Sequence, residues 1–236
     1  MILRLNNSKK DDYYKQTNNE RDPFNTCFPT SMINASRILI NKNLISYPNN
    51  TTNYSQPEDQ YDYFIHNDNE VYEFAKKNNQ IVEGYDLREM YAVEEFAFNK
   101  WVGKKACNLN LNITISEIID VLNSGGTVVT SGKFCGFAHV VTIVGYERVI
   151  GNDWDTIKDV SSEEMLNNTP KEFDLANLVN VIIADSYGDP RNGYKPVGVG
   201  GNGVILRFRD FLSMINKGTN DSPKYFGITF DPRTLS

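Results

Sequence analysis

The spacing of apolar residues divides the chain into a helical first half and a second half made mainly of strands. Apolar side chains recur every three or four positions in segments that predict helices over about 27–39, 69–78, 86–99 and 114–125. Short apolar and β-branched runs predict strands over 127–130, 139–146, 179–185, 204–208 and 225–230. Helices followed by strands favour an α+β fold.

Residues that commonly begin or end helices support these boundaries. Possible N-caps are Asp68, Asp86 with Glu89 as a capping box, Thr114 or Ser116, and Asp210 before a short helix at 211–216. Gly125 and Gly126 are suited to ending the helix that precedes the strand at 127–130. Local signals therefore agree with the apolar spacing.

Three segments have the composition of connections. Residues 47–63 carry two prolines and many Asn and Thr residues, which predicts a surface loop. Residues 147–178 are polar and acidic, and we interpret them as an insertion placed to shape substrate access. Residues 186–203 carry six glycines, so this backbone can approach a ligand or a neighbouring segment closely.

Composition indicates a soluble globular protein. The 236 residues are 40% hydrophobic and 23% charged, and without a composition break we expect a single domain over 1–236. A net charge of −6 without clustered Lys and Arg argues against nucleic acid as a partner, and no apolar run could span a membrane. The first residues lack a signal peptide, so we expect synthesis in the cytoplasm, with release by lysis or a non-classical route. The oligomeric state is not predicted.

The cysteines predict free thiols. Cys27, Cys107 and Cys135 are odd in number and lack the spacing of a disulfide framework or a zinc site. We expect Cys107 and Cys135 to be structural, because free cysteine is usually buried. The acidic loops do not have calcium-loop spacing, so we expect no metal ion and no cofactor.

Cys27 is the candidate nucleophile. It closes a polar, turn-rich loop and opens the predicted helix at 27–39, where Pro29 suits the first turn. Unpaired backbone N–H groups at a helix start favour an anion, so this position favours a reactive thiolate. The alternative is that Cys27 is a small buried hydrophobic residue.

The candidate base and acid lie in the strand half of the chain. His139 begins an apolar strand, whereas His66, the other histidine, lies among polar residues and suits a surface or capping role. Asp185 ends a strand, where a carboxylate is costly unless it is paired, for example with His139. Asp189, the competing acid, stands before Pro190 in a turn-like setting.

Three blocks of sequence resemble the papain-like cysteine peptidases, in the branch of bacteriocin-leader peptidases and related phage and bacterial hydrolases. The blocks are Gln16 to Leu39 with Gln16, Pro23, Thr26-Cys27 and Thr30-Ser31, then Ala138 to Tyr146, and then Ile182 to Pro190. Asn18 stands where this branch usually has aspartate, and it is not one of the catalytic positions. The resemblance implies an N-terminal helical side that carries the cysteine and a C-terminal antiparallel sheet that carries the histidine and the aspartate.

The same resemblance implies a catalytic triad of Cys27, His139 and Asp185, with Gln16 as an oxyanion donor. We therefore expect a cysteine hydrolase that cleaves peptide or amide bonds, with peptidoglycan stem peptides as the preferred substrate, as in an endolysin. A leader-peptide or effector protease that acts on proteins is the alternative enzyme. The alternative of another class is a non-catalytic binding module on a peptidase scaffold, because a fold alone does not imply activity.

Overall fold

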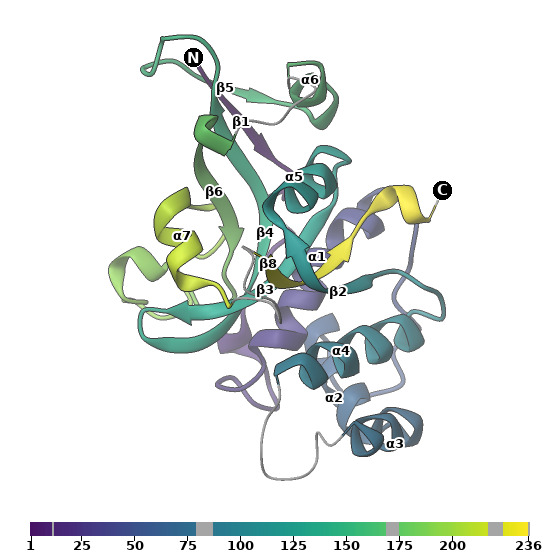
Figure 1. The fold of residues 1–236 in the computed structure, drawn as a ribbon. Helices are drawn as coiled ribbons and strands as arrows, with labels where there is room; N and C mark the ends of the chain where they lie inside the picture. The colour runs from purple at the N-terminus through teal and green to yellow at the C-terminus, as the bar shows by residue number, and fades with distance from the viewer. Residues whose placement is uncertain (11, 79–86, 169–174, 217–223, 236) are drawn as a thin grey trace.

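A computed structural model describes residues 1–10, 12–78, 87–168, 175–216 and 224–235, and it has the predicted α+β fold (Figure 1). The strands are β1 (Ile2–Asn6), β2 (Asn108–Thr114), β3 (Thr127–Phe134), β4 (Phe137–Val149), β5 (Ile157–Val160), β6 (Leu178–Ala184), β7 (Val204–Arg207) and β8 (Lys224–Phe230). The α-helices are α1 (Cys27–Asn41), α2 (Pro57–Asn67), α3 (Asn69–Lys77), α4 (Leu87–Trp101), α5 (Ile115–Asn123), α6 (Ser162–Asn167) and α7 (Phe208–Met214). Short 3-10 helices are η1 (Gln16–Asn18), η2 (Leu175–Asn177), η3 (Pro190–Asn192) and η4 (Pro232–Thr234).

The sheet is organised around β4. Its order is β2-β8-β3-β4-β1-β5, with β6 paired to β4 and β7 paired to β6, and the described pairs are antiparallel except β1 with β5. The strands β3 and β1 pair with successive stretches of β4, while β6 lies along its other edge. Gly145 is needed where β1 crosses, because a Cβ there would lie 2.0 Å from the Leu5 carbonyl oxygen.

Alternating side chains of the central strands fill two hydrophobic clusters. Val128 and Val141 belong to a cluster with α5 and α7, whereas their neighbours Val129 and Val140 belong to a cluster with α1 to α4. Successive residues of a strand point to opposite faces, so β3 and β4 supply both cores. Figure 1 shows α2, α3 and α4 gathered below the sheet, with α1 between them and the strands.

Several predicted boundaries are confirmed by the structure. Asp68 caps α3 through the backbone N–H groups of Glu70 and Val71, and Thr114 forms a capping box with Glu117 at the start of α5. The helices α1, α3, α4 and α5 and the strands β3, β4, β6, β7 and β8 lie where the apolar spacing predicts them. The proposed cap Asp86 lies outside the described residues.

Other predictions are corrected. The predicted loop at 47–63 contains the first half of α2, because Pro57 occupies the first helical turn, where a missing N–H costs nothing. The short helix α7 begins at Phe208, so Asp210 lies inside its first turn and does not cap it. The polar connection 147–178 contains β5, α6 and η2, and β1 and β2 were not predicted.

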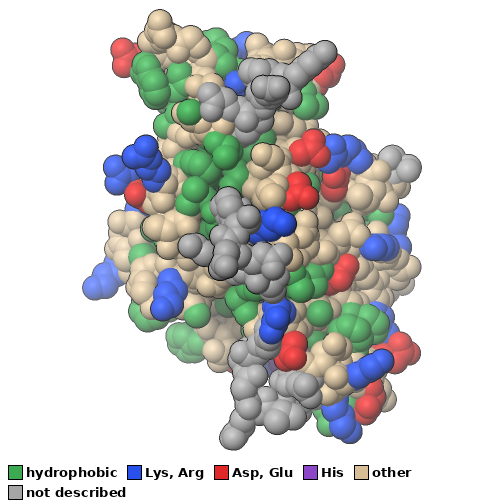
Figure 2. Space-filling model, in the orientation of Figure 1, with side chains coloured by type: hydrophobic (Ala, Val, Ile, Leu, Met, Phe, Trp, Pro, Cys, Tyr) green, Lys and Arg blue, Asp and Glu red, His purple; other side chains and the backbone are tan. Residues whose placement is uncertain are grey.

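None of the helices in the described part of the chain is long and apolar enough to cross a membrane. On the face drawn in Figure 2, Lys and Arg side chains are dispersed among Asp and Glu side chains and do not merge into a basic patch. The arrangement on this face is that of a mixed-charge surface.

Candidate active site

Cys27 is the first residue of α1 and its side chain is partly exposed. The preceding residue, Thr26, makes no side-chain cap, because its hydroxyl donates to the Asp22 carbonyl oxygen at 2.9 Å instead. The first backbone N–H groups of α1 therefore donate no hydrogen bond to the Thr26 side chain. A developing anion at the Cys27 thiol can use these donors.

Buried hydroxyl groups fix α1 against β4. The Ser31 hydroxyl donates to the Val140 carbonyl oxygen at 2.9 Å, and the Thr142 hydroxyl donates to the Ser31 carbonyl oxygen at 2.9 Å. Ser31 lies one turn after Cys27, and Val140 follows His139. These paired bonds therefore set the position of the thiol relative to the imidazole.

His139 is 8% exposed, and its electrostatic partners are the Asp185 carboxylate and the Cys27 thiol. Its Nε2 lies 2.7 Å from Asp185 Oδ1, which leaves Nδ1 as the nitrogen for the Cys27 thiol. Burial disfavours the charged imidazole, but the hydrogen bond to Asp185 and the interaction with Cys27 outweigh burial and raise the pKa of His139 to about 10. The imidazole is therefore held in its protonated form at neutral pH.

Aromatic side chains surround this imidazole. The rings of Phe134, Tyr187 and Tyr194 meet the His139 ring edge-on, at centroid distances of 6.2, 6.2 and 5.9 Å. These rings limit contact with water around the ion pair. A water-poor setting strengthens the electrostatic interaction between His139 and its partners.

Asp185 is fully buried and both of its carboxylate oxygens accept hydrogen bonds. Besides His139, the Tyr187 backbone N–H donates to Oδ1 at 2.9 Å and the Tyr194 hydroxyl donates to Oδ2 at 2.9 Å. Burial and the Asp185 charge raise the pKa of Tyr194 above its usual range, so the phenol keeps its proton and remains a donor. The carboxylate is thus fixed in one orientation toward His139.

The Gln16 side chain is anchored and 2% exposed. Its Nε2 donates to the Pro23 carbonyl oxygen at 3.3 Å, and its Oε1 accepts from the Ser186 hydroxyl at 2.8 Å. The Pro23 carbonyl can only accept, so the amide orientation is set by this pair of contacts. One N–H of the amide remains for a ligand.

Carboxylates of α2 hold the loop between Gln16 and Cys27. Asp59 Oδ1 accepts from the Glu20 backbone N–H at 2.9 Å, and Asp62 pairs with the Arg21 guanidinium at 3.2 Å. These contacts fix the backbone of the loop that follows Gln16. Helix α2 therefore supports the loop that precedes Cys27.

The competing acid and base have other partners. Asp189 caps η3 and forms an ion pair with Arg191, with 2.6 Å between Nη2 and Oδ2. His66 lies in the last turn of α2, and its Nδ1 is 2.8 Å from the Asp62 carbonyl oxygen. Asp189 and His66 are thus engaged elsewhere, whereas Asp185 contacts His139 directly.

The other two cysteines differ from each other. Cys107 is buried as expected, and burial raises the pKa of its thiol well above the usual value. The expectation of burial is wrong for Cys135, which is exposed in the turn between β3 and β4, with φ of 51°, followed by Gly136 with φ of 84°. Such a turn needs positive φ at both positions. Within the described ranges, no group of three His, Cys, Asp or Glu side chains could hold a metal ion.

Sequence reasoning missed the residues that support the site. Ser186 directly follows Asp185, so the sequence indicates that it lies near the site. Its hydrogen bond to Gln16 could not be predicted, because the two residues are 170 positions apart. Tyr194 reaches Asp185 only because of the path of the loop after β6, for which the sequence carries no periodic signal. Ser31 gave a signal only as part of the Thr30-Ser31 pair.

The chain matches the model of a known protein family. The family model described as the Peptidase_C39 like family matches residues 10–196, a range that includes Gln16, Cys27, His139 and Asp185. No curated protein and no solved structure matches the chain.

Proposed function

We propose that this chain, which belongs to the Peptidase_C39 like family and is a cysteine peptidase, cleaves its substrate with a triad of Cys27, His139 and Asp185. The observation that supports this proposal is the imidazole of His139, which is hydrogen-bonded to the Asp185 carboxylate at 2.7 Å and has the Cys27 thiol as its other electrostatic partner. A nucleophile beside a base that an acid orients is the usual signature of covalent catalysis.

In the acylation step, the Cys27 sulfur attacks the carbonyl carbon of the scissile bond. The carbonyl oxygen becomes an oxyanion, which the free N–H of the Gln16 amide and the Cys27 backbone N–H stabilise. His139 Nδ1 gives its proton to the leaving amine, and the C–N bond breaks to leave a thioester on Cys27.

In the deacylation step, His139 accepts a proton from water as that water attacks the thioester carbonyl carbon. The C–S bond breaks, the acid product leaves, and the thiolate and imidazolium are restored. Asp185 keeps its hydrogen bond to Nε2 throughout, so Nδ1 keeps facing the sulfur.

For the substrate we propose the stem peptides of peptidoglycan, which would make the enzyme an endolysin-like endopeptidase or amidase. Support comes from the resemblance of the three sequence blocks to phage and bacterial hydrolases. The net charge of −6 offers no attraction to an anionic wall, so binding must rest on specific contacts.

The test is digestion of purified peptidoglycans beside a peptide library, read by mass spectrometry of the released ends. We expect new amino termini within stem peptides for the native protein and none for Cys27→Ala. Cys135→Ala is the matched control and should keep full activity. Cleavage of library peptides with intact peptidoglycan would favour a protease acting on proteins, and no cleavage of either would favour a binding module.

A further inference from the structure

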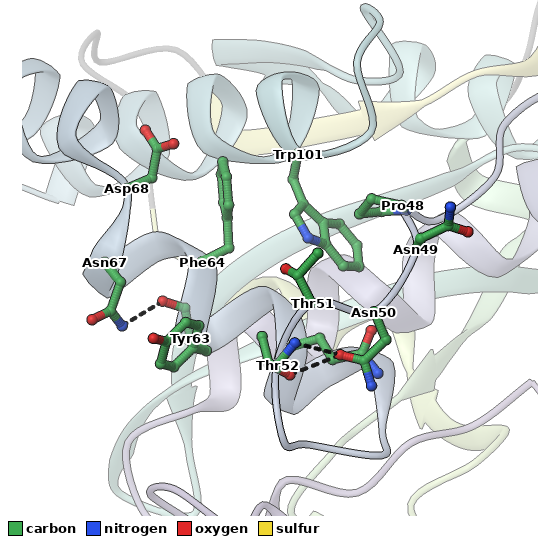
Figure 3. Close-up of a pocket in the computed structure, with 11 residues that line it drawn as sticks. Pro48, Asn49, Asn50, Thr51, Thr52, Tyr63, Phe64, Asn67, Asp68 and Trp101 are labelled. Atoms are coloured by element: carbon green, nitrogen blue, oxygen red, sulfur yellow. Dashed lines mark hydrogen bonds between the residues drawn. The ribbon is translucent and has the colours of Figure 1, made fainter.

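A second feature of the helical side is a pocket of about 310 Å³ that the triad does not use (Figure 3). It lies between the segment 48–52, the helix α2 and the end of α4. This volume is near the lower end of the roughly 300–1,000 Å³ typical of small-molecule sites.

One face of α2 forms a wall of this pocket. Its residues recur at positions i, i+3, i+4 and i+7, and they are Gln60, Tyr63, Phe64 and Asn67. The carboxylates that hold the Gln16 loop lie at Asp59 and Asp62, on other faces of the same helix. The pocket and the loop contacts are therefore separate features of α2.

Aromatic rings give the pocket rigid apolar surfaces. Trp101 is 8% exposed and packs against Tyr61 and Tyr47 at centroid distances of 5.1 and 5.2 Å, so its indole is fixed in place. Figure 3 shows the indole between Phe64 and Pro48, facing the segment that carries Thr51. Tyr63 is 40% exposed beside the pocket.

Apart from Asp68, the polar side chains that line the pocket are neutral, and some of them form no hydrogen bond to another described residue. Among the described residues, the Asn49 amide and the Thr51 hydroxyl have no hydrogen-bond partner. Asn67 donates through Nδ2 to the Tyr63 carbonyl oxygen and Gln60 donates through Nε2 to the Tyr54 carbonyl oxygen, which leaves both amide oxygens as acceptors. The pocket thus offers donors and acceptors close to aromatic surface.

The charged side chain in the lining is already occupied. Asp68 accepts from the Glu70 and Val71 backbone N–H groups, and both of its oxygens lie 3.0 Å from Lys100 Nζ. A ligand with a phosphate, carboxylate or ammonium group would find no free countercharge among these lining residues. The chemistry favours a neutral ligand that carries many hydroxyl groups.

A sugar ring has this chemistry, since its hydroxyls donate and accept around the edge while its C–H faces pack on aromatic rings. From the lining we propose that this pocket binds a saccharide, and specifically an N-acetylhexosamine unit of the glycan strand. The N-acetylated identity rests on the proposed peptidoglycan substrate, whereas the saccharide class rests on the pocket alone.

The test is a binding titration of the Cys27→Ala protein with chitotetraose, an oligomer of N-acetylglucosamine, and with cellotetraose, which has the same linkage without acetamido groups. The chain has two tryptophans, and adding Trp154→Phe leaves Trp101 as the fluorescent reporter. We expect a saturable change in fluorescence with chitotetraose and a much weaker one with cellotetraose. Calorimetry checks the affinity independently.

Substitutions of residues that line the pocket test whether the saccharide binds there. Tyr63→Ala and Thr51→Val each change an accessible side chain, and we expect Tyr63→Ala to weaken chitotetraose binding about tenfold. Tyr72→Ala is the matched control, because Tyr72 is 50% exposed on α3 and does not line this pocket. Melting temperatures establish that each variant is folded.

Each result decides a defined part of the proposal. No saccharide binding at millimolar concentrations, or binding that Tyr63→Ala and Thr51→Val leave unchanged, would overturn the pocket assignment. Equal binding of cellotetraose would overturn the acetamido preference. Because these measurements use Cys27→Ala, failure of the proposed peptidase substrate shows in the digestion experiment and not here.

Discussion

The Ser186 hydroxyl donates to Gln16 Oε1 at 2.8 Å, and so joins the residue after the site's acid to the proposed oxyanion donor. The Gln16 backbone N–H also donates to the Ser186 carbonyl oxygen, at 3.1 Å. The position of Gln16 is therefore set by the strand side of the molecule as well as by its own loop.

Loss of the Gln16 amide should lower kcat. Removal of one oxyanion donor costs about 10²–10³ in kcat, and we expect Gln16→Ala to fall in that range. Ser186→Ala keeps the amide but removes its anchor, so we expect a smaller loss of about tenfold, with a nearly unchanged KM. Steady-state kinetics on a cleavable peptide measures both values.

The control for this series is Ser36→Ala, because Ser36 is a buried α1 hydroxyl that donates to the Ile33 carbonyl oxygen, away from the thiol. It should change stability and leave kcat unchanged. A Gln16→Ala protein with normal kcat would remove Gln16 from the reaction.

Asp185 and Asp189 should differ sharply on substitution. In a serine triad the corresponding Asp→Asn change costs about 10⁴ in kcat. The protonated His139 already carries both ring protons, so we expect a smaller loss of roughly ten- to a thousand-fold for Asp185→Asn. Asp189→Asn breaks the ion pair with Arg191 and should leave kcat near normal. The opposite order of effects would make Asp189 the orienting acid.

The pH dependence of activity should depend on Asp185. Because the pKa of His139 is raised from 6.5 to about 10, its protonated form stabilises the folded site fully below about 6.5, and this contribution is lost as the pH rises through about 10. We expect activity to persist into the alkaline range, and Asp185→Asn to move the alkaline limb down by about one unit or more. Profiles of kcat/KM against pH for both proteins test this. An unmoved limb would show that Asp185 does not hold the imidazolium.

Glu94 should make the fold less stable as the pH rises. Burial raises the pKa of Glu94 from 4.5 to about 8, and the Tyr61 hydroxyl donates to its Oε2 at 2.9 Å. A raised carboxyl pKa means that the folded state binds the proton more tightly, so stability falls as the pH rises from about 4.5 through about 8. Glu94→Gln keeps an acceptor for Tyr61 without the ionisation.

We therefore expect Glu94→Gln to lose less stability than the native protein between about pH 5 and about pH 9. Each pKa unit corresponds to about 1.4 kcal/mol, and about 1 kcal/mol shifts Tm by roughly 2–4 °C in a chain of this size. Thermal and urea unfolding across this range measure the difference. Parallel curves for the two proteins would contradict the buried, protonated state of Glu94.

The sequence predicted correctly those features that depend on interactions between residues close together in the chain. Asp68 and Thr114 cap helices in the structure because a side-chain oxygen needs only the next few N–H groups. The same reasoning failed for α2, where polar residues around Pro57 were interpreted as a loop although the buried Tyr61 packs on Trp101 from another helix. Packing against another helix therefore stabilises the helical conformation of this segment.

The candidate site also contains some residues that the sequence indicated and others that only the structure shows. The block patterns around Gln16, Cys27, His139 and Asp185 pointed to these positions, and the structure brings His139 to Asp185 and to Cys27. The contacts of Tyr194 and Ser31 depend on how a loop and a helix are placed against the sheet, and no spacing along the chain records this. Their roles required three-dimensional structure.

The bond between Gln16 and Ser186 spans 170 positions, and that between His139 and Asp185 spans 46. Contacts so distant along the chain form late in folding, since long loops must close before they contribute. A growing or partly folded chain therefore holds Cys27 before His139, Asp185 and the contact between Gln16 and Ser186 are in place. We expect the complete arrangement to form only when β6 has joined β4, because β6 leads directly to Asp185 and Ser186.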